Sequence, residues 1–257
     1  MNLFTNGCSF TYGGALGLDG PENNETRLKS VWPHYLGNLL NADNTYNLSD
    51  GCGSNDRTLR TTISWLLHHK KHSPEKLNNL IAVIQLTELS RYEYYVPKNS
   101  KDKFEDINDA IGGPVVTPSR WAKCKVDLCQ HWLIKDYGDP PDEFYVDTND
   151  RAISRYTDIE GSYKLLYQIE AFTSIFKKFN IKYFYWDYDD NRLLSVPDHI
   201  RDYILNDSAK PWLNWDYELN QMISWKYDFV GKTDHHPSLI GHREVASLMY
   251  EKIKNSI

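Results

Sequence analysis

The chain has 257 residues, of which 40% are hydrophobic and 25% are charged, a balance typical of a globular protein with one large domain. Its formal net charge of -6 gives no electrostatic reason to expect a nucleic-acid partner. No run of about 18 apolar residues occurs and no signal-peptide pattern opens the chain, so we expect no membrane partner. The four cysteines, Cys8, Cys52, Cys124 and Cys129, are too few for a disulfide framework and predict a reducing, cytoplasmic setting.

Strand-like and helix-like apolar patterns alternate through the first part of the chain. We expect strands over 2–4 and 45–49 and a helix over 31–40. A further helix begins after Ser54 or Asn55 and carries Leu59, Ile63, Leu66 and Leu67 on one face. The continuous apolar run over 80–87 is typical of a central strand that is buried on both faces.

Residues 89–155 interrupt this alternation, and we interpret them as an insertion or cap within a single domain that spans residues 1–257. A short helix is expected inside the insertion, around 121–133. Regular elements then resume with a helix through Leu166 and Phe179, a strand over 181–188 and a final helix over 239–255. This order predicts a parallel sheet covered on both faces, with reactive groups at the carboxyl ends of its strands.

Small polar residues follow the first two strands. "GCSFT" (7–11) places Ser9 in a turn after the first strand, and "NLSDGCGSND" (47–56) follows the second, where glycines let backbone N–H groups approach an anion. The glycine-rich stretch 13–20 lacks the Lys-Ser/Thr of a phosphate loop and is interpreted as a mobile lip of the cleft.

The segment "TDHHPSLIGHREVA" precedes and begins the last helix. Pro237 biases His236 away from helical backbone, and Ser238 is a candidate N-cap. A histidine on this loop could act as a general base if Asp234, two residues earlier, holds its ring in one tautomer. His235 is the competing histidine, although its neighbour Asp234 is too close in sequence to orient it easily.

Taken together, "GCS" (7–9), "NLSDGCGS" (47–54) and "DHHPSLIGH" (234–242) resemble blocks of the SGNH (GDSL-like) hydrolase superfamily in order and placement. The resemblance covers both ends of the chain and its central strand but not the insertion. It implies a three-layer α/β/α, flavodoxin-like fold with about five parallel strands. It also implies that Ser9 attacks an ester carbonyl, with His236 as base and Asp234 as its orienting partner.

The resemblance further implies an oxyanion hole made by the backbone N–H groups of Ser9 and of Gly51 or Gly53, where one donor contributes on the order of 3 kcal/mol. The third family block, Gly-x-Asn-Asp, is missing after the central strand, which ends "VIQLTELSR" (83–91). Thr87 is the candidate replacement donor, and Asn55 and Gln85 are the other candidates. Cys8 stands where the family has an Asp that is not part of the triad, and the spacing here is Asp-x-His instead of Asp-x-x-His.

The leading hypothesis is therefore a serine esterase that acts on small acyl esters such as acetyl esters, with carbohydrate esters among its candidate substrates. An acyltransferase would use the same residues, and a non-catalytic SGNH-like binding module is the alternative from another class. We expect no cofactor. A metal site from Asp234, His235, His236 and His242 is the weaker interpretation, since His242 lies inside the final helix.

Overall fold

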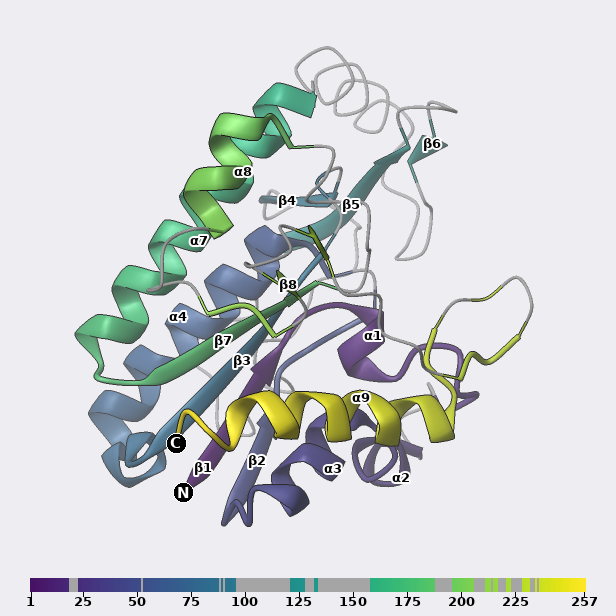
Figure 1. Cartoon of the computed structure of the whole chain (residues 1–257), viewed down its shortest axis with the longest axis vertical. Helices are drawn as coiled ribbons and strands as arrows, with labels where there is room; N and C mark the ends of the chain where they lie inside the picture. The colour runs from purple at the N-terminus through teal and green to yellow at the C-terminus, as the bar shows by residue number, and fades with distance from the viewer. Residues whose placement is uncertain are drawn as a thin grey trace.

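The computed structural model describes the helices and strands of the chain and many of the connections between them (Figure 1). The residues that it describes are 1–18, 23–51, 53–87, 89, 91–95, 121–127, 132–133, 158–187, 196–205, 211–213, 215–216, 221–222, 228–231, 234 and 236–257.

The central element is a four-stranded sheet in which every neighbouring pair is parallel. Its order is β2 (Asn44–Asn47), β1 (Asn2–Asn6), β3 (Leu80–Leu86) and β7 (Lys182–Asp187). All four strands lie where the apolar patterns predict them. The expected sheet has about five strands, and the described residues supply four to it.

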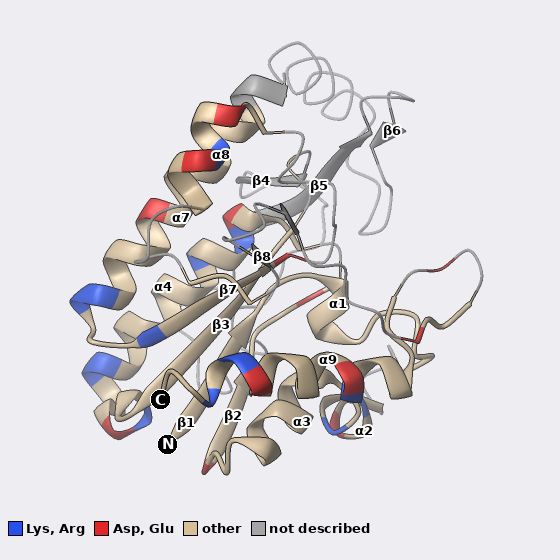
Figure 2. Cartoon of the chain, viewed as in Figure 1, with Lys and Arg blue, Asp and Glu red and all other residues tan. Residues whose placement is uncertain are grey.

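The two inner strands, β1 and β3, carry no charged residue and expose no side chain, as expected for a parallel sheet that is covered on both faces. All five residues of β1 and all seven of β3 are buried. Figure 2 accordingly shows the charged residues mainly on helices and at strand ends. Alternate residues of β3 face opposite sides, with Val83 in one apolar cluster and Ala82 and Ile84 in the other.

Helices cover both faces of this sheet (Figure 1). On the Val83 side lie α3 (Trp32–Leu39) and α9 (Leu239–Ile253). On the other side lie α4 (Asn55–His72), α7 (Asp158–Lys178) and α8 (Asp198–Leu205). Two short helices, α1 (Ser9–Tyr12) and α2 (Asn24–Leu28), follow β1 in the chain, and a 3-10 turn (Pro74–Leu77) precedes β3.

The predicted start of α4 is confirmed with Ser54, one of the two candidates, as the N-cap, since its hydroxyl accepts a hydrogen bond from the N–H of Arg57. The predicted buried face of α4 is partly wrong, because Leu67 is 54% exposed whereas Leu66 is buried. The inward face also carries threonines, which hydrogen-bond to the end of β1.

The helix expected around 121–133 is wrong. That segment forms β5 (Trp121–Asp127) and β6 (Trp132–Leu133), and β5 pairs with β4 (Arg91–Tyr95) in an antiparallel sheet. The reason is visible in the pattern, because Lys123, Lys125 and Asp127 alternate with apolar residues at the strand period of two. A separate ribbon pairs β8 (Trp215–Asp216) with β9 (Gln221–Met222). None of the helices described here has the length and apolar character needed to cross a membrane.

Candidate active site

Ser9 is displayed by a tight turn that directly follows β1. We call residues Gly7–Thr11, which carry the candidate nucleophile Ser9, the nucleophile turn. Cys8 has extended backbone at the N-cap of α1, and Ser9 is the first helical residue. The side chain of Cys8 is buried in the core, whereas Ser9 is half-buried. The Ser9 hydroxyl lies 4.0 Å from Cys8 Sγ, so the two side chains are neighbours, and of the two only Ser9 has solvent-exposed surface to offer a ligand.

Three side chains predicted to form a triad lie within hydrogen-bonding distance of one another. His236 Nε2 lies 2.7 Å from Ser9 Oγ, and His236 Nδ1 lies 2.6 Å from Asp234 Oδ1. The same carboxylate oxygen accepts the backbone N–H of His236 at 3.0 Å. A carboxylate only accepts, so Nδ1 carries the ring proton and Nε2 is left to accept from the serine hydroxyl.

Phe10 and Gly14 lie against the His236 imidazole, and the sequence predicts neither contact. The ring of Phe10 stacks on the ring of His236 with centroids 4.5 Å apart. Gly14 packs closely against both Ser9 and His236, because a Cβ at position 14 would lie 3.0 Å from Ser9 Cβ and 3.4 Å from His236 Nε2. Gly14 belongs to the stretch interpreted from sequence as a lip of the cleft, and here it forms a wall of the Ser9–His236 contact.

The loop that carries His236 is hydrogen-bonded on both sides of Pro237 to the segment 228–230. Val230 N–H donates to the His236 carbonyl at 3.0 Å, and Ser238 N–H donates to the Asp228 carbonyl at 2.8 Å. Ser238 also caps α9 by accepting from Gly241 N–H, as the sequence predicts. Glycine at position 241 allows the Asp228 backbone to approach α9 this closely, since a Cβ at that position would lie 2.1 Å from the Asp228 carbonyl oxygen.

The loop after β2 touches the nucleophile turn, which places the second sequence block beside the first. Asp50 N–H lies 3.4 Å from the Gly7 carbonyl oxygen, and a Cβ on Gly53 would lie 3.0 Å from the same oxygen. The N–H of Gly53 itself donates to the Asp50 carbonyl at 3.2 Å. Among the donors proposed for an oxyanion, the N–H of Ser9 has no partner within the part of the chain that the structure describes.

The candidates for the missing third block are all buried at the end of β3. The Asn55 amide binds the backbone of Thr87 twice, donating to its carbonyl at 3.0 Å and accepting from its N–H at 2.8 Å. Gln85 directs its amide to the nucleophile turn. Both amides therefore hold backbone in place. His235 and Cys52 lie outside the described residues, and in the described ranges no group of three or more His, Cys, Asp or Glu could hold a metal ion.

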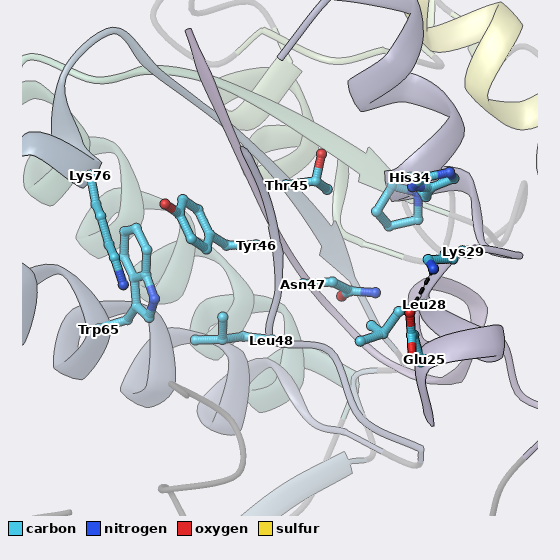
Figure 3. Close-up of a pocket in the computed structure, with 11 residues that line it drawn as sticks. Glu25, Leu28, Lys29, His34, Thr45, Tyr46, Asn47, Leu48, Trp65 and Lys76 are labelled. Carbon is cyan, nitrogen blue, oxygen red and sulfur yellow. Dashed lines mark hydrogen bonds and ion pairs between the residues drawn. The ribbon is translucent and has the colours of Figure 1, made fainter. Parts of the chain in front are cut away.

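A pocket of about 500 Å³ lies along the outer edge of the sheet, at β2 (Figure 3). Tyr46 and Trp65 line it on one side of the strand, and Thr45 and Asn47 line it on the other. Ser9, Asp234 and His236 are not among the residues that line this pocket. It borders the nucleophile turn at Asn47, whose amide donates to the Thr11 carbonyl at 3.1 Å.

Comparison with known proteins adds one match. Residues 17–118 are similar to a family of unknown function (DUF6071), a span that is less than half of the chain and leaves out Ser9, Asp234 and His236. The search of curated proteins found no match.

Proposed function

We propose that the chain is a serine esterase of the SGNH type, with Ser9 as nucleophile, His236 as general base and Asp234 as its orienting carboxylate. The observation that carries the proposal is the single imidazole that reaches Ser9 Oγ with one nitrogen and Asp234 with the other, at 2.7 and 2.6 Å. Ser9 lies 225 positions from Asp234 and 227 positions from His236 in sequence, so no local turn preference brings Ser9 to the other two.

The proposed chemistry follows from these contacts. Ser9 transfers its hydroxyl proton to His236 Nε2 as Oγ attacks the ester carbonyl, and Asp234 stabilises the imidazolium that forms. The imidazolium then protonates the leaving alcohol, which leaves an acyl group on Ser9. A water molecule, activated by the same nitrogen, releases the acid and restores the serine.

Backbone N–H groups would stabilise the oxyanion in this proposal. The Ser9 N–H is the first donor, because it has no other partner among the described residues. Gly51 is the second candidate. Gly53 would have to release the Asp50 carbonyl before it could donate, and Thr87 stays a candidate through its hydroxyl.

The fold supports this assignment as far as a parallel sheet with the site at the carboxyl ends of its strands. The finer architecture belongs to the proposal: three layers, a flavodoxin-like order with about five strands, and a single domain with an insertion at 89–155. Small acyl esters, with carbohydrate esters among them, are the proposed substrates. An acyltransferase that passes the acyl group to another hydroxyl would use the same residues.

Labelling with a fluorophosphonate probe, read by intact mass, tests the proposal. We expect one adduct on the wild-type protein and none on Ser9→Ala or His236→Ala, with Cys8→Ala as the matched control that keeps the adduct. Absence of an adduct on a folded wild-type protein would refute the esterase and favour the binding module. In that case Ser9→Ala would leave ligand affinity intact.

A further inference from the structure

A buried amide lies directly beneath the nucleophile turn. Gln85 is the penultimate residue of β3, one of the two inner strands of the sheet, and is fully buried. Its Oε1 accepts from the Cys8 N–H at 3.2 Å and from the Thr11 hydroxyl at 2.6 Å, and its Nε2 lies 3.1 Å from Cys8 Sγ. All three contacts are made to the nucleophile turn, from a residue 74 to 77 positions away in sequence.

The turn packs against this side chain without a gap. A Cβ on Gly7 would lie 2.6 Å from Gln85 Cβ and 2.7 Å from its Oε1. Any side chain at position 7 would therefore displace the amide or lift the turn from the sheet. The glycine before the nucleophile is thus explained by close approach to Gln85, since Gly7 is not among the residues with positive φ.

The short helix that carries Ser9 has little stability of its own. It spans four residues, has no side-chain cap and no acidic residue in its first turn. A helix of one turn forms only when outside contacts hold it, because its nucleation is costly. Gln85 supplies two such contacts, one just before Ser9 at Cys8 and one two residues after it at Thr11.

Two other buried amides lie near the turn, and one of them, Asn6, contacts it on the side before Ser9, where its Oδ1 accepts from the Gly7 N–H at 2.9 Å. Asn6 donates to the Thr61 and Thr62 hydroxyls at 2.8 and 3.0 Å, which ties the end of β1 to α4. Asn55 binds the backbone of Thr87. Of these three amides, Gln85 is the one whose contacts bracket Ser9.

We propose that Gln85 is a positioning residue that fixes the backbone N–H and the Oγ of Ser9 relative to His236. It forms no bond to substrate and exchanges no proton in the reaction. The proposal rests on the proposed function for its catalytic consequence, but its structural part, restraint of the nucleophile turn, stands independently.

The kinetic test measures the rate of fluorophosphonate labelling in three variants. Gln85→Met keeps the volume and removes every hydrogen bond, so we expect its maximal labelling rate to fall about 10–100-fold while probe affinity changes little. Gln85→Glu keeps an acceptor oxygen toward Cys8 and Thr11 and should recover part of that loss. Phe176→Leu, a core change in α7 that packs on Tyr183, is the stability control and should leave the rate unchanged well below its melting temperature.

A second readout does not depend on catalysis. Cys8 is fully buried, so alkylation of its thiol, followed by mass spectrometry of the Cys8 peptide, reports local opening of the turn. We expect faster alkylation in Gln85→Met and unchanged alkylation in Phe176→Leu. Thr11→Val removes one contact alone and should give an intermediate effect, which keeps the test decisive if Gln85→Met does not fold.

The outcomes separate the two proposals. Absence of labelling on the wild-type protein would overturn the esterase proposal, and the alkylation rates of Cys8 would still test whether Gln85 restrains the turn. Equal rates in Gln85→Met and wild type, or an equal loss in Phe176→Leu, would overturn the positioning role. Slower labelling with faster alkylation in the Gln85 variant alone supports it.

Discussion

His242 should make the stability of the protein strongly dependent on pH. It lies in α9 with no exposed surface, and its Nδ1 accepts a hydrogen bond from the backbone N–H of Trp32 at 3.2 Å. Burial lowers the pKa of His242 from 6.5 to about 3, and the nearby His236 contributes in the same direction. The folded protein therefore holds this ring neutral at pH values where the unfolded chain protonates it.

The sign and size follow from that difference. Below pH 6.5 the unfolded state binds a proton that the folded state refuses, so the free energy of unfolding falls as the pH falls, down to about pH 3. Between pH 7 and pH 5 the loss is about 2 kcal/mol, from about 1.4 kcal/mol for each pH unit below 6.5. For a chain of this size the melting temperature would drop by about 4–8 °C.

Urea unfolding of wild-type protein and His242→Asn at the two pH values measures this contribution. The side-chain oxygen of the introduced Asn can accept the hydrogen bond from the Trp32 N–H near the position of Nδ1. The stability lost with the imidazole ring is the same at both pH values, so it cancels when the change between pH 7 and pH 5 is compared for the two proteins. His69, whose pKa burial lowers to about 4, titrates in both proteins. We expect the wild type to lose about 2 kcal/mol more than the variant between pH 7 and pH 5. Equal losses in the two proteins would refute the reasoning.

Three further changes test the site and the fold. Asp234→Asn should slow fluorophosphonate labelling at least about 100-fold, because Nδ1 would lose the carboxylate that fixes the tautomer; unchanged rates would show that the carboxylate plays no part. Gly241→Ala should lower both the melting temperature and the labelling rate, since its Cβ would lie 2.1 Å from the Asp228 carbonyl, whereas Gly231→Ala, with nothing within 4 Å, should change neither. Ser54→Ala should cost about 1 kcal/mol in urea unfolding through the lost cap of α4, with labelling unchanged.

What the sequence predicts well depends on local signals. The buried run at β3, the Ser54 cap and the Ser238 cap are each read from a few neighbouring residues. Pro237 biases His236 away from helical backbone, and the Asp234 carboxylate, only two residues away in sequence, lies within hydrogen-bonding distance of the His236 ring.

What the sequence does not predict depends on contacts between distant segments. Gly241 looks like an ordinary helix residue until the Asp228 carbonyl is placed against it. Phe10 looks like a core aromatic in the sequence, and the residue on which it stacks, His236, lies near the other end of the chain. Gln85 reads as a polar interruption of a strand, and only the sheet order, with β1 beside β3, brings it under the nucleophile turn.

The missing third block has a physical consequence for how activity should be judged. Asn55, the first residue of α4, uses its amide to hold both backbone groups of Thr87, so the end of β3 is fixed without the family's Gly-x-Asn-Asp. In the proposed esterase, stabilisation of an oxyanion would then fall more heavily on backbone N–H groups such as that of Ser9. Loss of one donor costs on the order of 3 kcal/mol, about 100-fold in rate. Slow ester turnover would therefore agree with a complete Ser9–His236–Asp234 arrangement, and the dependence of labelling on Ser9 and His236 is what separates a slow esterase from a binding module.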